Sequence, residues 1–343
     1  MPAVRVLIVD DSAYVRKIVK EMLSRGGLDV VGAARDGEEG LRLVEELKPD
    51  VVTCDLIMPG TDGVSFIRQQ MARRPLPIIV VSIAAEASET VLAALDAGAI
   101  DFVQKPTALA TEKIFAIGDE LVAKVMAAAG APLGAVGRLV AEAAVPARPR
   151  AYANRFDLVA IGVSTGGPQG LKAVIPALPG DFPAAVAIVL HMPIGYTEGY
   201  AKRLNEMTAL TVVEARDGER VRPGHVYLAP AGQHLGFRRD AAEQVVASLD
   251  IRPLDTPHRP SVDVLFQSAA AMYGERVLAV VMTGMGSDGR EGAAWVKARG
   301  GCVITEAQET CVVYGMPRSV VEAGLSDAAV PLTGLAGAIL ERT

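Results

Sequence analysis

Short, uninterrupted apolar runs recur along the first half of this chain, and each is followed by a segment with helical periodicity. The runs cover residues 4–9, 28–33, 50–54, 78–82 and about 100–103. Continuous apolar strands that alternate with helices are typical of a parallel sheet covered on both faces. The first half is therefore predicted to be an α/β domain, a doubly wound (βα)5 unit.

The chain has 343 residues, which is more than one domain usually holds. Residues 130–154 are rich in Ala, Pro, Gly and Arg, a composition typical of an interdomain linker. We therefore expect one domain over 1–129, a linker over 130–154 and a second domain over 155–343. Further apolar runs predict that the second domain is also doubly wound and mostly parallel, with a β-hairpin insertion near His234.

The composition limits the function classes. The net charge is −6 and neither half is basic, so nucleic acid is not expected as a partner. The three cysteines have no metal-type spacing and are expected to be reduced thiols. No run reaches the roughly 18 apolar residues of a membrane span, and the N-terminus has no signal-peptide pattern. We expect a cytoplasmic protein with no membrane insertion.

Polar side chains suited to one task follow four of the five strands of the first half. Asp10 and Asp11 follow the first strand, Asp55 the third, Ser82 closes the fourth, and Lys105 follows the fifth. The carboxyl ends of parallel strands form the crevice in which chemistry usually takes place. Three carboxylates at one point favour a bound Mg²⁺, beside which an aspartate can attack a phosphoryl group. Lys105 would hold one phosphate oxygen and Ser82 would donate a hydrogen bond to another.

Acidic residues after strands can also be ordinary helix N-caps. Taken singly, Asp11 and Asp36 favour that interpretation. The full set at the ends of four strands favours the metal and phosphate site.

A candidate nucleophile stands at the start of the second domain. Gly162-Val163-Ser164-Thr165-Gly166 forms a G-x-S-x-G motif between a strand at 157–163 and a helix expected over 167–178. Such a turn exposes a serine hydroxyl, and the helix N-terminus offers backbone N–H groups to an oxyanion. A plain glycine-rich turn remains the alternative.

A serine nucleophile needs a base, and the chain has four histidines. His191 ends the apolar run 184–190 and is favoured by that position. The others are expected to be structural: His225 at a strand start, His234 in a hairpin and His258 in a segment bounded by prolines.

The orienting carboxylate should also come from a strand end. Asp288 follows the apolar run 276–283 and is the best candidate, because a buried Asp fixes the tautomer of the imidazole. Asp263 and Glu275 lie at the wrong ends of their elements. The order Ser-His-Asp differs from that of the α/β-hydrolases, so that fold is not supported.

One pattern competes with the hydrolase interpretation. Residues 284–289 (GMGSDG) satisfy G-x-G-x-x-G after a strand, and Glu306 ends the next strand, as in dinucleotide-binding units. Against this, Asp288 would place a carboxylate beside the pyrophosphate.

The first half resembles a response-regulator receiver domain. The matching stretches are VDDS (9–12), DLIMPGTDG (55–63), VVSIAAE (80–86) and VQKP (103–106). The resemblance implies that Asp55 accepts phosphate from a histidine kinase, that Asp10, Asp11 and Asp55 bind Mg²⁺, and that Ser82 and Lys105 sense the phosphate. Thr61 departs from the methionine that is frequent there.

The second half resembles the catalytic domain of the chemotaxis protein-glutamate methylesterases, and the whole chain matches their two-domain layout. The matching stretches are AIGVSTGGP (160–168), HMPIGYTEGYAKRL (191–204), APAGQHL (229–235), PSVDVLFQSAA (260–270), VVMTGMGSDGREG (280–292) and TCVVYGMP (310–317). The resemblance implies a Ser164-His191-Asp288 triad, with Thr165 and Met285 lining the site and Met285 as a backbone oxyanion donor. Arg290 departs from the small residue common at its position.

The resemblance further implies a substrate and a form of control. Methylated chemoreceptors would be demethylated and their glutamines deamidated, without a cofactor in the esterase domain. Phosphorylation would relieve a block by the receiver. A dehydrogenase, a transcriptional regulator and a non-catalytic phospho-switch scaffold remain the alternative classes.

Overall fold

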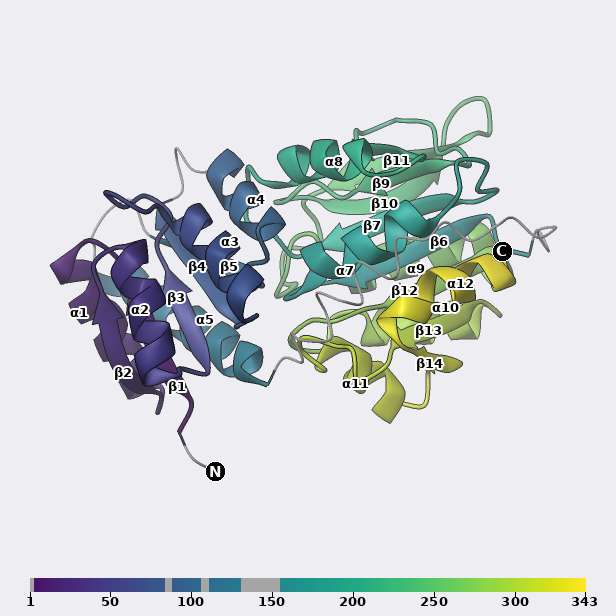
Figure 1. Cartoon of the computed structure of the whole chain (residues 1–343). Coiled ribbons are helices and arrows are strands. Elements are labelled where there is room, and N and C mark those ends of the chain that lie inside the picture. The colour runs from purple at the N-terminus through teal and green to yellow at the C-terminus, as the bar shows by residue number, and fades with distance from the viewer. Residues whose placement is uncertain (1–2, 84–87, 106–110, 131–154) are drawn as a thin grey trace. The chain divides into compact units, whose positions relative to one another are not determined.

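The computed structural model describes residues 3–83, 88–105, 111–130 and 155–343 (Figure 1). The chain divides into two compact units, Met1–Gly137 and Arg138–Thr343. The predicted linker, apart from Gly130, lies outside the described residues, as do 84–86 and Pro106 of the receiver-like stretches. Among the described helices none is both long and apolar enough to cross a membrane.

The first unit is the predicted five-stranded parallel sheet, in the order β2-β1-β3-β4-β5. Its strands are β1 (Arg5–Val9), β2 (Asp29–Ala34), β3 (Val51–Cys54), β4 (Ile78–Ile83) and β5 (Asp101–Lys105). Its helices are α1 (Ala13–Arg25), α2 (Gly37–Leu47), α3 (Gly63–Arg73), α4 (Ser88–Asp96) and α5 (Thr111–Ala129). Helix α1 contacts α5, and α3 contacts α2 and α4, so the helices cover both faces of the sheet (Figure 1).

Local sequence explains where several of these helices begin. The side chains of Ser12, Asp36 and Asp62 each accept a hydrogen bond from a backbone N–H of the first turn of α1, α2 and α3. Asp36 is therefore the N-cap that its position suggested. Asp11 is not a cap, because Ser12 has that role, which leaves the Asp11 carboxylate for the strand-end cluster.

The second unit contains a seven-stranded sheet in the order β14-β13-β12-β6-β7-β9-β8, and every neighbouring pair in it is parallel. The strands are β6 (Leu158–Val163), β7 (Ala185–Leu190), β8 (Thr211–Glu214), β9 (His225–Leu228), β12 (Val277–Val281), β13 (Cys302–Glu306) and β14 (Ala328–Val330). The predicted hairpin insertion is β10 (His234–Arg239) paired antiparallel with β11 (Val245–Asp250). The α/β prediction for both units is confirmed.

Helices again cover the sheet of the second unit (Figure 1). They are α7 (Gly167–Val174), α8 (Thr197–Glu206), α9 (Val262–Tyr273), α10 (Arg290–Ala298), α11 (Met316–Glu322) and α12 (Leu332–Arg342), with single 3-10 turns η1 (Ile175–Ala177) and η2 (Gly274–Arg276). Helix α7 contacts α12, whereas α9 contacts α10 and the hairpin strand β10. The helix expected over 167–178 is shorter as an α-helix, because Pro176 lacks the N–H that would continue it.

Strand order brings distant residues together at one edge of this sheet. Val163 pairs with Leu190, and Val281 pairs with Gly162. Strand β6 therefore lies between β7 and β12, and the residues that follow these strands, Ser164, His191 and the segment after Val281, meet at their carboxyl ends.

Candidate functional sites

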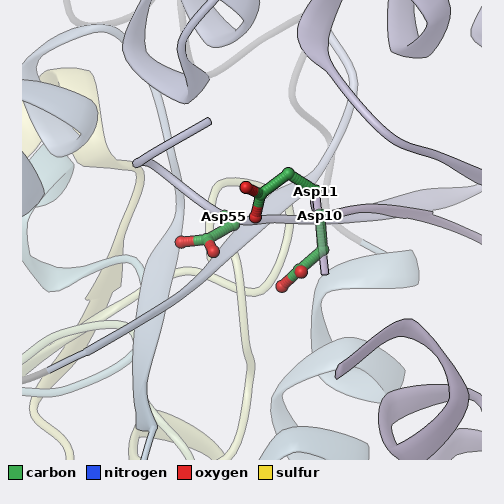
Figure 2. A group of neighbouring side chains, drawn as sticks. All are labelled: Asp10, Asp11 and Asp55. Carbon is green, nitrogen blue, oxygen red and sulfur yellow. The ribbon is translucent and has the colours of Figure 1, made fainter. Parts of the chain in front are cut away.

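Three carboxylates meet at the carboxyl edge of the first sheet. One oxygen from each of Asp10, Asp11 and Asp55 lies within 4.8 Å of the others (Figure 2). The backbone fixes two of them, since Ser12 N donates to Asp10 Oδ1 at 2.9 Å and Leu56 N donates to Asp55 Oδ1 at 2.7 Å. A cluster of hard oxygen donors suits Mg²⁺, so these residues fit the predicted metal.

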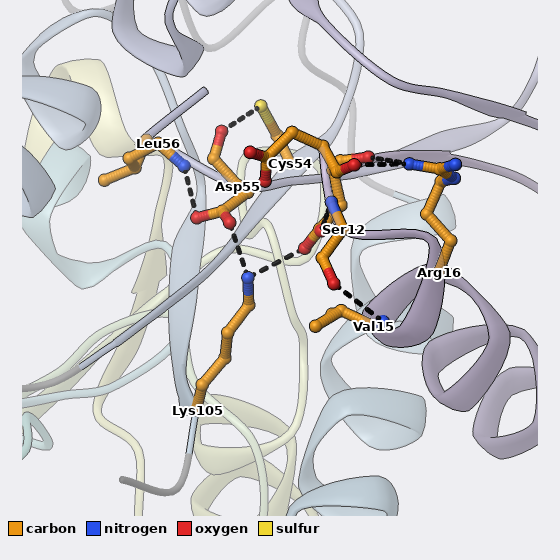
Figure 3. Close-up of polar contacts among 9 residues, drawn as sticks. Ser12, Val15, Arg16, Cys54, Asp55, Leu56 and Lys105 are labelled. Carbon is orange, nitrogen blue, oxygen red and sulfur yellow. Dashed lines mark hydrogen bonds and ion pairs between the residues drawn. The ribbon is translucent and has the colours of Figure 1, made fainter. Parts of the chain in front are cut away.

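Lys105 joins the cluster from the end of β5. Its Nζ donates to Asp10 Oδ2 at 2.7 Å and to Asp55 Oδ2 at 2.6 Å, as the dashed lines in Figure 3 show. Burial opposes the charge of Lys105, but the two carboxylates outweigh it and raise the pKa of the ammonium. Burial raises the pKa of Asp10, while Lys105 lowers it in part.

Ser82 lies at the end of the neighbouring strand. Its hydroxyl is buried and has no hydrogen-bond partner among the described residues. An unpaired buried hydroxyl costs free energy unless something binds it. Its position at the edge shared with Asp55 and Lys105 fits a donor to a phosphate oxygen.

Ser164 occupies the turn between β6 and α7. Its N–H donates to Thr283 O at 3.0 Å, and its carbonyl accepts from Gly167 N at 2.7 Å. Gly166 has φ +80°, a left-handed conformation that glycine adopts without strain. This is the strand-turn-helix context that the G-x-S-x-G motif predicted.

His191 and Asp288 are in contact. His191 Nε2 lies 2.9 Å from Asp288 Oδ2, and both side chains are nine-tenths buried. The other ring nitrogen, Nδ1, is buried and has no partner among the described residues. Ser164 and His191 each follow paired residues of β6 and β7, and His191 N donates to Val163 O at 3.1 Å, so the two residues stand at neighbouring strand ends.

Asp288 is held at the N-terminus of α9. Its carboxylate accepts Val262 N at 2.8 Å, Asp263 N at 2.9 Å and the Ser261 hydroxyl at 2.9 Å. Burial alone would raise the pKa of Asp288, but the contact with His191 and the helix N–H groups hold it well below its usual range. Asp288 is therefore a carboxylate fixed in one orientation.

Asp263 lies beside this carboxylate, contrary to what its place in the sequence suggested. Its Oδ1 accepts Gly289 N at 2.9 Å and Gly292 N at 2.7 Å. Burial raises the pKa of Asp263 to about 6, and the charge of Asp288 adds to that effect. The one sequence signal was its spacing two residues after the Ser261 N-cap, in the first turn of α9.

The remaining histidines are not alike. The His258 ring stacks on the His191 ring with centroids 4.1 Å apart and 21° between planes. His234 is 1% exposed and contacts the segment that carries His258. His225 Nδ1 lies 3.0 Å from Pro223 O, near the start of β9. Sequence position favoured His191 over the other histidines but gave no reason to connect His258 or His234 to it.

The dinucleotide pattern has another explanation. A Cβ at Gly284 would lie 2.4 Å from Met316 Sδ and 2.7 Å from Ser164 Cβ, so this glycine allows close packing behind the serine. Glu306, fully buried, accepts Thr283 N at 2.9 Å and the Thr310 hydroxyl at 3.1 Å, one on each oxygen. The acidic residue of the pattern is therefore engaged inside the domain.

The other predicted residues lie around Ser164 and Asp288. Thr165 is 2% exposed, and its carbonyl accepts the Thr283 hydroxyl at 3.0 Å. Met285 is half-buried and follows Gly284, whose carbonyl accepts the N–H groups of Gly315 and Met316 at the start of α11. Arg290 is exposed at the first position of α10.

These sites define a class of protein: a two-domain α/β chain with an acidic receiver site in one unit and a serine, histidine and aspartate gathered at strand ends in the other. Residues 6–115 match the response regulator receiver domain, and residues 159–339 match the CheB methylesterase. This chain belongs to the CheB methylesterase family.

Relatives cover nearly the whole chain. A Myxococcus xanthus protein named protein-glutamate methylesterase/protein-glutamine glutaminase 5 is 51% identical over 97% of this chain and 96% of its own length. One from Symbiobacterium thermophilum with the corresponding name is 44% identical over 98% of this chain and 96% of its own length. The crystal structure of the Thermotoga maritima CheB methylesterase catalytic domain is 45% identical, with a TM-score of 0.53, and covers 55% of this chain and 99% of that chain.

Proposed function

We propose that this chain removes methyl esters from glutamate residues of chemoreceptors and deamidates receptor glutamines in the cytoplasm, under the control of phosphorylation. The activity corresponds to the names of its relatives. The observation that carries the proposal is the His191–Asp288 contact at 2.9 Å. It leaves His191 Nδ1 buried and without a partner among the described residues, at the strand end next to that of Ser164.

The proposed reaction begins at Ser164. Its Oγ attacks the ester carbonyl carbon while His191 Nδ1 takes the hydroxyl proton. The negative charge that forms on the carbonyl oxygen is held by backbone donors near Thr165 and Met285. His191 returns the proton to the leaving methoxide, so methanol departs and an acyl-serine remains. A water molecule then hydrolyses this ester, with His191 again as the base.

In the proposed reaction Asp288 fixes the tautomer of His191. Its carboxylate can only accept at Nε2, so Nε2 carries the hydrogen and Nδ1 keeps the lone pair. In the best-known serine hydrolases the carboxylate faces Nδ1 and Nε2 is the base. In the proposed mechanism the two nitrogens of His191 have the reverse roles: Nε2 faces the carboxylate and Nδ1 is the base. Asp288 also stabilises the imidazolium that forms.

The first unit supplies the control in this proposal. Asp55 of the receiver domain, 1–129, would accept phosphate from a histidine kinase. Asp10, Asp11 and Asp55 would hold the Mg²⁺ that neutralises charge on the phosphate oxygens. Ser82 and Lys105 would bind the phosphate. The unphosphorylated receiver would block the catalytic domain, 155–343, to which the linker 130–154 joins it. Phosphorylation would relieve this block, because phosphate favours the arrangement in which the catalytic site is open.

Methanol release from a methylated receptor, with and without a small phosphodonor, tests the proposal. The wild-type chain should release methanol faster with the phosphodonor, Asp55→Asn should not respond, and Ser164→Ala should be inactive. A fragment that begins near Tyr152 should be active without phosphodonor. Full turnover by folded Ser164→Ala would overturn the serine mechanism, and a folded but inert fragment would overturn the block by the receiver.

A further inference from the structure

We propose that His234 is a positioning residue of the catalytic site. Its two ring nitrogens hold the two segments that place Asp288 and His258 against His191. The proposal rests on the proposed triad and extends it to a side chain in the hairpin insertion.

The contacts of His234 define its tautomer. Ser261 N donates to His234 Nδ1 at 3.2 Å, so Nδ1 carries the lone pair. The hydrogen is therefore on Nε2, which lies 3.1 Å from Pro253 O and 3.3 Å from the Thr256 hydroxyl. Each nitrogen is satisfied only in the neutral ring with the proton on Nε2.

The Nδ1 contact leads to the proposed triad in two steps. Ser261 is the N-cap of α9, and its hydroxyl donates to Asp288 Oδ1 at 2.9 Å. The next N–H groups of the helix donate to the same carboxylate, which faces His191 Nε2. His234 thus holds the backbone of Ser261, the first of three consecutive residues that donate hydrogen bonds to Asp288.

The Nε2 contact leads to His191 by a second route. It holds the segment from Pro253 to Thr256, two residues before His258. His258 stacks on the face of His191, and burial, followed by the charge of His191, lowers the pKa of His258. A neutral ring in this place shields the face of His191 without repelling the imidazolium that forms during the reaction.

The surroundings favour the neutral form of His234. Burial lowers its pKa, while its bond to Pro253 opposes the shift. Among charged groups, Arg259 also lowers the pKa, and Asp288 and Asp250 raise it. A protonated Nδ1 would place its own N–H against the Ser261 N–H, and two donors cannot bond to each other. The hydrogen bond that holds Ser261 therefore requires the neutral ring.

Substitutions at His234 in the full chain separate its two contacts. His234→Asn keeps an acceptor near the position of Nδ1, His234→Gln keeps a donor near Nε2, and His234→Ala keeps neither. We expect the Ala variant to lose about ten- to hundred-fold in kcat for methyl-ester hydrolysis with little change in KM, since the proposed triad is displaced and the docking surface is not. Both amide variants should recover part of that loss. His225→Ala, at a ring away from the site, is the matched control.

A spectroscopic measurement distinguishes positioning from stability. The proton on His191 Nε2 that faces Asp288 should give a downfield ¹H signal in the wild type, and this signal should shift or broaden in folded His234→Ala. The chain has only four histidines, so single substitutions assign the ring signals. A lower melting temperature with an unshifted signal, or kcat within twofold of wild type while Ser164→Ala is inactive, would overturn the inference. If the wild type itself released no methanol, the proposed function would fail instead, and the shift of the proton signal would still test the positioning.

Discussion

Asp288 and Asp263 cap each other's helices. Asp288, before α10, accepts N–H groups at the start of α9, and Asp263, in the first turn of α9, accepts Gly289 N and Gly292 N at the start of α10. The reciprocal arrangement locks two helix N-termini together at the carboxyl edge of the sheet. The carboxylate that faces His191 is therefore part of the packing of α9 against α10.

The Asp263 carboxylate can be tested by two substitutions. Asp263→Asn keeps the oxygen that accepts both N–H groups, whereas Asp263→Ala removes it and should cost about 1–2 kcal/mol of stability. Trp295, the single tryptophan, lies in α10, so its fluorescence follows the unfolding of the second unit. Equal stability of the Ala and Asn variants in urea at pH 7 would contradict the capping role.

Asp263 also predicts a pH dependence. Its folded-state pKa is raised from 3.8 to about 6. Its contribution to stability is therefore fully present below about pH 3.8 and is lost as the pH rises through about 6. We expect the stability of Asp263→Asn, relative to wild type, to improve between pH 4 and pH 7 in the same fluorescence assay. An unchanged difference across that range would count against the raised pKa.

Asp288→Asn should lower kcat by about 10³- to 10⁴-fold with KM little changed, because the amide no longer fixes the Nε2–H tautomer or stabilises the imidazolium. Methanol release under saturating substrate measures this. Ser261→Ala removes only one of the bonds to Asp288 and should lower kcat much less. An Asp288→Asn enzyme with more than a tenth of wild-type kcat would remove Asp288 from the mechanism.

Gly284→Ala should lower kcat without affecting the receiver. The new Cβ would lie 2.7 Å from Ser164 Cβ and 3.1 Å from Ser164 N, so the serine turn must shift. A displacement of about 1 Å can cost about a hundred-fold in rate. Gly337→Ala, in α12 with nothing within 4 Å of the new Cβ, is the control and should keep full activity. Unaltered kcat in Gly284→Ala would mean that the turn tolerates the shift.

Glu306 predicts a second pH effect. Burial raises its pKa from 4.5 to about 7, although bonds from Thr283 and Thr310 oppose the shift. The neutral acid stabilises the fold fully below about pH 4.5, and that contribution is lost as the pH rises through about 7. Glu306→Gln should therefore gain up to about 3 kcal/mol relative to wild type between those pH values. Urea unfolding followed at Trp295 measures it, and a difference that is constant with pH would refute the assignment.

In the receiver, Lys105→Ala should bind Mg²⁺ more tightly than wild type. The ammonium at 2.7 Å and 2.6 Å from Asp10 and Asp55 competes with a divalent cation for their charge. Calorimetric titration with MgCl₂ measures the change, and Asp55→Asn, which removes a proposed ligand, should weaken binding. Weaker Mg²⁺ binding by Lys105→Ala would show that the lysine does not compete with the metal.

Strand ends were what the sequence could predict best. Asp55, Lys105, Ser164 and His191 all follow continuous apolar runs, and such runs show in the sequence where a parallel strand ends. The edge strands β8 and β14 were not predicted. Strand β8 is four residues long and mixes polar with apolar residues, and β14 has only three residues, none of them fully buried.

Side-chain contacts between residues far apart in the chain could not be predicted from the sequence. Asp263 looked misplaced because the reach of its side chain to Gly289 depends on how α9 packs on α10. His234 and His258 looked structural for a similar reason: their partners are set by a loop whose course no local pattern encodes. Hydrogen bonds between residues far apart in the chain depend on the finished packing.

The order of the strands has a consequence for the newborn chain on the ribosome. Ser164 and His191 emerge early in the second unit, but Asp288 follows His191 by 97 residues and comes with β12, which must insert beside β6. The receiver and the first strands of the second unit can thus fold while no aligned triad exists. Under the proposed mechanism, hydrolytic competence arises only late in synthesis, after the whole regulatory unit has left the ribosome.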